Sequence, residues 1–153
     1  MDVLYYWRDV AEDTKAGRIG WFRADRKKLL DLQAGMPDRI WVFKTPKGQK
    51  GNVQLLARMR WADNAVVPVT RVPGMSYMYY DPAHADSVRF TDSGTPAAIE
   101  ETTRWMREHF WSSIGGNFQG EHGQQPMRGA VLEQLKRIAS AFEAVPFMEP
   151  VKA

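Results

Sequence analysis

Cysteine is absent from this 153-residue chain. Its absence excludes disulfides, thiolate metal ligands and a cysteine nucleophile, and it favours a cytoplasmic location. No apolar run is long enough to cross a bilayer, and the N-terminal sequence MDVLYYWRDV lacks the basic and apolar regions of a signal peptide. We therefore expect a cytoplasmic protein that has no membrane partner.

Catalytic and metal-binding motifs are also missing. The three histidines, His84, His109 and His122, lack the spacing of metal ligands. No glycine-containing segment follows the GxGxxG or GxxxxGKS/T arrangement, and no serine has the context of a nucleophile elbow. We assign no catalytic residue, no metal site and no cofactor. The alternative of an enzyme acting on a nucleic acid or nucleotide requires two of Asp38, His84, Glu121 and His122 to meet in one cleft.

The composition indicates one globular domain with a mild excess of positive charge. Hydrophobic residues make up 44% of the chain and charged residues 25%, which is ordinary for a folded protein. A length of 153 residues suits a single domain spanning 1–153. The net charge of +3 and the pI of about 9.3 are compatible with a polyanionic partner such as nucleic acid.

The first part of the chain, about residues 1–92, has the pattern of a β-barrel. Residues 52–61 alternate most clearly, with one apolar face and one largely polar, basic face. Further strands are predicted at residues 3–8, 18–22, 39–44, 65–72, 76–80 and 87–91. Asp25 is the expected N-cap of a helix that runs through residue 33, and residues 12–17 are an expected loop. The spacing of the strands predicts a small, strongly bent sheet or barrel.

The remaining residues, about 95–145, are predicted to form a helical extension. Thr95 and Pro96 open a helix to about residue 110, and the Gly, Gln and Asn content of residues 111–125 predicts a long loop. Residues 128–142 carry the apolar stripe of an amphipathic helix. This stripe either packs on the barrel or docks a partner protein or a second copy of the chain. The tail after residue 145 is expected to pack loosely.

Aromatic and cationic side chains interleave in the β part. A base stacked on an aromatic face gains about 1–3 kcal/mol, and cations that contact phosphates add a salt-dependent term. Trp21 lies between a glycine turn and a basic helix, where we expect a pocket mouth, whereas the strand face shared by Trp41 and Phe43 is either core or ligand-facing. The candidates for stacking on a base are Trp7, Trp21, Trp41, Phe43 and Tyr77. The candidates for binding phosphate are Arg23, Arg26, Lys27, Arg58 and Arg60.

The order of these features resembles the PUA-like superfamily, and within it the EVE, ASCH and YTH-type domains. The resemblance covers about residues 1–92: Tyr6-Trp7 in the first strand, Trp21 before a basic helix, and the strands DRIWVFK and GNVQLLARMRW. Gly35 and Asp38 match the Gly-Asp signal of the family, with two residues inserted between them. The resemblance implies a compact β-barrel flanked by helices, with a cleft that accepts a nucleobase flipped out of RNA or DNA into an aromatic cage.

We therefore expect an α+β fold, a small and strongly bent PUA-like β-barrel flanked by helices, with the C-terminal helices packed on it. The leading functional hypothesis is a nucleic-acid-binding module, not an enzyme, that recognises an unmodified or modified nucleobase in an aromatic pocket. RNA and DNA are equally compatible with this hypothesis. Its central requirement is that indole rings stay open to solvent beside positively charged side chains.

Overall fold

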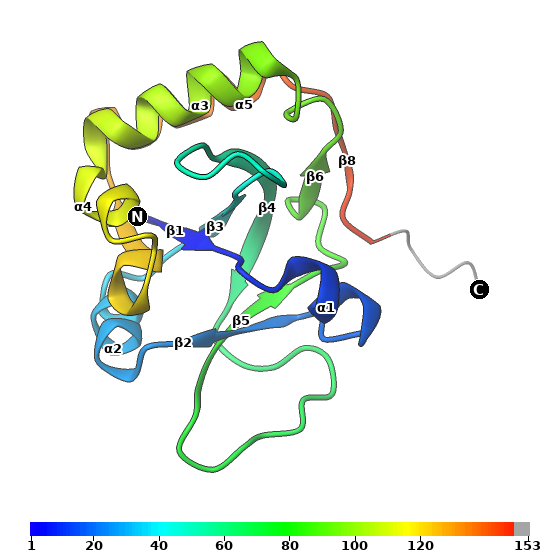
Figure 1. Cartoon of the computed structure of the whole chain (residues 1–153). Coiled ribbons are helices and arrows are strands. Elements are labelled where there is room, and N and C mark those ends of the chain that lie inside the picture. The colour runs from blue at the N-terminus through cyan, green and yellow to red at the C-terminus, as the bar shows by residue number, and fades with distance from the viewer. Residues whose placement is uncertain (149–153) are drawn as a thin grey trace.

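One strongly curled mixed sheet organises the chain in the computed structural model, which describes residues 1–148 (Figure 1). The strands are β1 (Asp2–Tyr6), β2 (Trp21–Ala24), β3 (Arg39–Lys44), β4 (Gln54–Ala62), β5 (Ser76–Asp81), β6 (Val88–Phe90), β7 (Gln124–Met127) and β8 (Ala144–Pro146). The helices are α1 (Val10–Lys15), α2 (Arg26–Ala34), α3 (Pro96–His109), α4 (Trp111–Gly115) and α5 (Gly129–Ser140), with a 3-10 helix η1 (Gly120–Gly123). The fold is therefore α+β, as predicted.

The strand order of the sheet is β2-β5-β4-β3-β1-β7, and two short strands extend it because β6 pairs with β4 and β8 pairs with β6. Strands β1 and β3 are parallel, and the other pairs are antiparallel. A parallel pair needs a long crossover connection. Here the crossover contains α1, β2 and α2, and it places β2 at one edge of the sheet.

The N-terminal caps predicted from the sequence are present in α2 and α3. The Asp25 side chain accepts a hydrogen bond from the backbone N–H of Lys28 (3.0 Å) at the start of α2. The Thr95 side chain accepts one from Ala98 N–H (3.2 Å), and Pro96 occupies the first turn of α3. Each cap satisfies one backbone donor that the helix itself leaves free, which fixes where the helix begins.

The long helices α3 and α5 lie side by side over one face of the sheet (Figure 1). The apolar stripe of α5 packs into the core through Leu132, Leu135 and Ala139. The C-terminal helices are thus packed on the sheet, as predicted. The stripe is covered within the chain, so the partner-docking hypothesis loses its main support.

A β-bulge divides β4 between two apolar clusters. Its pairing with β3 steps from Val42 opposite Ala57 to Phe43 opposite Leu55, which leaves Leu56 as the extra residue. The extra residue shifts the alternation of β4 by one, so Leu55 and Ala57 lie on different faces of the sheet. The helix-side cluster contains Leu4, Trp41, Phe43, Val53, Leu55, Phe90, Trp105, Met106, Phe118, Met127, Leu132, Leu135 and Ala139. The sheet-interior cluster contains Val3, Trp7, Phe22, Leu29, Leu32, Ile40, Val42, Ala57, Met59, Trp61, Met78 and Tyr80.

Four segments differ from the sequence predictions. The expected loop at 12–17 overlaps helix α1, and the expected loop at 111–125 contains α4, η1 and the start of β7. The expected strand at 65–72 is a loop, because no neighbouring strand pairs with it and Val66 and Val72 are about half exposed. In the tail, β8 pairs with β6 and Phe147 packs edge-on against Tyr80, so this part is ordered; residues 149–153 lie outside the described residues.

Candidate functional site

Trp21 stands between two adjoining hollows at the β2 edge of the sheet. The Trp21 hollow, of about 220 Å³, lies between the end of β1, helix α1 and β2. The loop hollow, of about 340 Å³, lies between β2 and the loop that precedes β5. Trp21 is partly exposed, and it lines both hollows together with Arg18 and Arg23. The Tyr77 ring packs edge-on against Trp21, with ring centroids 5.3 Å apart, and supports the indole on the side of the loop hollow.

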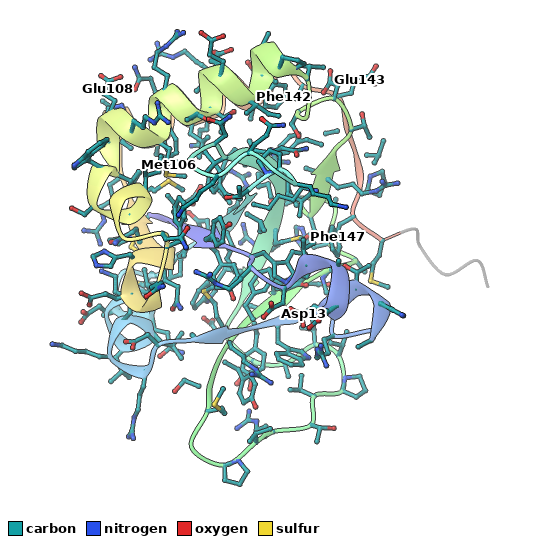
Figure 2. The ribbon with its side chains drawn as sticks, viewed as in Figure 1. Asp13, Met106, Glu108, Phe142, Glu143 and Phe147 are labelled. Atoms are coloured by element: carbon teal, nitrogen blue, oxygen red, sulfur yellow. The ribbon has the colours of Figure 1, made fainter. Side chains whose placement is uncertain are left out.

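Helix α1 supplies the carboxylate that organises the Trp21 hollow. Trp7 Nε1 donates a hydrogen bond to Asp13 Oδ2 (2.7 Å), and Arg18 Nε donates to Asp13 Oδ1 (2.8 Å). Asp13 lies on α1, which projects beside the curled sheet (Figure 2). The ion pair is partly exposed and contributes little by itself, but the Trp7 indole is only 3% exposed and its N–H needs this acceptor. Asp13 therefore fixes both the ring at the base of the hollow and the cation at its rim.

The wall of the Trp21 hollow carries charges of both signs. Its cations are Arg8, Arg18 and Arg23, and its carboxylates are Asp9, Glu12 and Asp13. With Asp13 occupied by Trp7 and Arg18, the Asp9 and Glu12 side chains form no hydrogen bond or ion pair with residues 1–148. Burial desolvates the nearby Tyr5 hydroxyl and raises its pKa, and the negative charges of Asp13 and Asp9 raise the pKa further. The hollow thus combines an aromatic face, cations and two available acceptors.

Four of the residues predicted from the sequence meet around these hollows. Trp7, Trp21 and Arg23 line the Trp21 hollow, and Trp21, Arg23 and Tyr77 line the loop hollow. Tyr77 is 7% exposed, and its hydroxyl accepts a hydrogen bond from Val72 N–H (2.8 Å), which ties the loop to β5. Trp7 and Tyr77 therefore shape the walls, and Trp21 is the ring with the open face.

The assignment of Trp41 and Phe43 as base-stacking residues was wrong. Phe43 is 0% exposed and stacks on Trp105 at a centroid distance of 5.8 Å. Trp41 is 1% exposed, and its Nε1 donates to Asp2 Oδ2 (2.8 Å). Both residues lie on β3, which is paired on each side. Phe43 is enclosed in the core and the Arg58 guanidinium lies over the Trp41 ring, so neither ring offers an open face for a base.

The predicted phosphate-binding cations do not form one group. Arg23 lines both hollows, whereas Arg26 and Lys27 are exposed in the first turn of α2 and line neither. Arg58 and Arg60 lie on β4 in a separate basic cluster. The rim cations Arg8 and Arg18 and the acceptors Asp9 and Glu12 were missed. Their position between two aromatic segments was a usable signal, but the unpredicted helix α1 hid their convergence.

The residues of the enzyme hypothesis do not line either hollow. Asp38, His84, Glu121 and His122 are absent from both linings, and His84 Nδ1 accepts a hydrogen bond from Asp86 N–H (3.0 Å) within its turn. Residues 1–148 contain no cluster of three or more His, Asp or Glu side chains able to hold a metal ion. The requirement that two of these residues share a cleft is thus not met at the Trp21 edge.

Comparison with family models, with curated proteins and with solved structures finds no match to this chain. Within residues 1–148, none of the helices combines the length and apolar character needed to span a membrane.

Proposed function

We propose that this chain binds single-stranded or locally opened nucleic acid and holds one base against Trp21. The observation that carries the proposal is the partly exposed Trp21 indole, with a hollow on each side and Arg18 and Arg23 at both rims. Aromatic faces beside cations are the usual means of binding unpaired bases and their phosphates. The curled sheet with flanking helices is compatible with the PUA-like barrel that the sequence resembles, and this relationship is part of the proposal.

Each component of the Trp21 hollow has a distinct role in this proposal. The base stacks on Trp21, and the Asp9 and Glu12 carboxylates accept hydrogen bonds from an exocyclic amine or ring N–H, as acids do when they contact cytosine. Arg18 and Arg23 pair with the flanking phosphates. A base that carries donors on its edge, in RNA or DNA and with or without a modification, fits this arrangement better than a base with acceptors only.

The test is a titration of fluorescently labelled single-stranded oligonucleotides against the whole chain and its Trp21→Ala variant. Loss of a stacked face corresponds to about 1–3 kcal/mol, so the variant should bind roughly 5- to 150-fold more weakly than the micromolar range expected of the wild type. Trp111→Ala is the matched control, because Trp111 is 67% exposed and lines neither hollow. Equal affinity of the Trp21→Ala and Trp111→Ala variants would exclude the proposed stacking.

Salt dependence separates phosphate contacts from stacking. If Arg18 and Arg23 each contact a phosphate, raising the salt from 50 to 200 mM should weaken binding about 7-fold, from a slope of about −0.7 per contact on a single strand. The Arg23→Gln variant should reduce that slope by about 0.7. An affinity that does not change with salt would rule out phosphate contacts.

A further inference from the structure

A basic hollow lies under α5, beside β6 and β8. This Arg58 hollow has a volume of about 420 Å³ and is lined by Arg39, Trp41, Arg58, Phe90, Lys136, Ala139, Ser140, Phe142 and Ala144. It shares no lining residue with the Trp21 hollow or the loop hollow. Phe142, beyond the end of α5, and Asp13 on α1 are well separated in Figure 2. The two sites are therefore distinct.

The Arg58 hollow is unlike the Trp21 hollow because its lining holds three cations and no carboxylate. The nearest acid to Arg39 is Asp86, whose Oδ2 lies 3.5 Å from Arg39 Nη2 and also 3.6 Å from Arg60 Nη1. Within residues 1–148, no carboxylate oxygen lies within 4.0 Å of the Arg58 guanidinium. The positive charge is therefore only partly compensated.

The two arginines of this hollow retain hydrogen-bonding capacity. Arg58 Nε donates to the backbone oxygen of Asp86 (3.2 Å), while its guanidinium lies 5.7 Å from the centroid of the Trp41 ring. Arg39 Nε is buried and has no hydrogen-bond partner among the described residues. Partial burial and the charge of Arg39 lower the pKa of Arg58. A bound anion offsets the cost of holding two guanidinium groups close together.

Beside the two arginines, the hollow has an apolar wall and a lysine. The Phe90 and Phe142 rings pack edge-on with centroids 5.9 Å apart, and Ala139 and Ala144 complete this wall. Lys136 lies on α5 across from β3 and β4, and its only ion pair within residues 1–148 is a partly exposed one with Glu133 (3.3 Å). The wall thus has a cationic part and an aromatic part.

We propose that the Arg58 hollow binds a terminal phosphomonoester, with the phosphate held by Arg39, Arg58 and Lys136 and an attached aromatic group resting on Phe90 and Phe142. Three cations that line one hollow match a group of charge near −2 with three acceptor oxygens better than they match a singly charged carboxylate. The phosphate belongs either to a free aromatic phosphate or to the 5′ end of a nucleic acid strand. This inference does not rest on the function proposed for Trp21.

The first test is calorimetric titration of the whole chain with phenyl phosphate, phenol and inorganic phosphate. Phenyl phosphate should bind saturably, and more tightly than either fragment. Arg58→Gln and Lys136→Gln should each weaken its binding about tenfold or more, because each removes a charge-assisted contact. Lys47→Gln, at an exposed lysine outside the hollow, should change it less than twofold. Absence of saturable binding, or unchanged affinity in Lys136→Gln, would overturn the proposal.

Two controls keep the outcome interpretable. Arg58 also covers Trp41, so the unfolding midpoint of Arg58→Gln is measured first, and Lys136→Gln decides the matter if Arg58→Gln does not fold. Trp21→Ala should leave phenyl phosphate binding unchanged, and a parallel loss would instead locate the phosphate in the Trp21 hollow.

If an oligonucleotide binds through its 5′-phosphate more tightly than phenyl phosphate does, the natural ligand is a strand end. The reverse order identifies a free aromatic phosphate.

Discussion

Replacing Asp13 with alanine removes the carboxylate that accepts hydrogen bonds from both Trp7 and Arg18. The Trp7 side chain is 3% exposed, so its N–H is left in a place that water hardly reaches, at a cost of about 1–3 kcal/mol. The Arg18 pair is partly exposed and adds less than about 1 kcal/mol. We expect the free energy of unfolding to fall by about 2–3 kcal/mol, or the melting temperature by roughly 5–10 °C for a chain of this size.

The assay is urea unfolding followed by far-UV circular dichroism and tryptophan fluorescence. Glu12→Ala is the matched control, since Glu12 is an exposed carboxylate beside Asp13 on the same helix; it should change stability by no more than about 0.5 kcal/mol. Asp13→Asn keeps one acceptor oxygen for the two donors and should show an intermediate loss.

A double-mutant cycle with Trp7→Phe isolates the hydrogen bond. Phenylalanine lacks the indole N–H, so in that background Asp13→Ala should cost about 1–2 kcal/mol less than in the wild type. Asp13 does not hold the Trp7 indole in this way if Asp13→Ala is as stable as Glu12→Ala, or if the effects of Asp13→Ala and Trp7→Phe are additive within about 0.5 kcal/mol.

Two further predictions concern the core and alkaline pH. Phe43→Ala should lower the free energy of unfolding by about 3–5 kcal/mol in urea titrations, whereas a change below about 1 kcal/mol would show that the helix-side cluster is loosely packed. The pKa of Tyr5 is raised by folding, so its contribution to stability is complete below the ordinary tyrosine pKa of 10.0 and is lost as pH rises above it, because the unfolded chain then releases the proton first. Urea midpoints from pH 8 to 11 should fall, less steeply in Tyr5→Phe; an identical slope in the variant would contradict this assignment.

The sequence predicted those elements whose local signals agree with their environment. The alternation at 52–61 corresponds to β4, and the caps at Asp25 and Thr95 mark the starts of α2 and α3. The apolar stripe at 128–142 corresponds to α5. The caps of α2 and α3 and the hydrophobic periods of β4 and α5 are local signals that agree with the fold, so little depended on long-range contacts.

The sequence predictions were wrong where long-range contacts determine the secondary structure. Helix α1 has six residues and buries none of them, so it has no apolar period to detect. Strand β7 reads Gln-Gln-Pro-Met and forms because β1 offers it a free edge, whereas the β-branched segment at 65–72 finds no such edge.

In the candidate site too, some features follow from local sequence and others from long-range contacts. Trp21 precedes a basic helix and lines two hollows, and its role in binding stays a prediction. The positions of Trp41 and Phe43 depended on whether both faces of β3 are covered, and that follows from the parallel β1–β3 pairing and from helices far along the chain. Period-2 patterning shows which residues share a face but not what lies against it.

Because of the extra residue in β4, the strands before residue 92 and the helices after Thr95 share one core. Since one half of the strand belongs with α3 and α5 and the other half with α2, no cut between residues 92 and 95 separates two self-sufficient pieces. A fragment ending at residue 92 leaves Val53, Leu55 and Phe43 without their cover, and we expect it to aggregate and not to fold. The helices after Thr95 are therefore as much a part of the folding unit as the strands before it, although the change in sequence character there suggests an appendage.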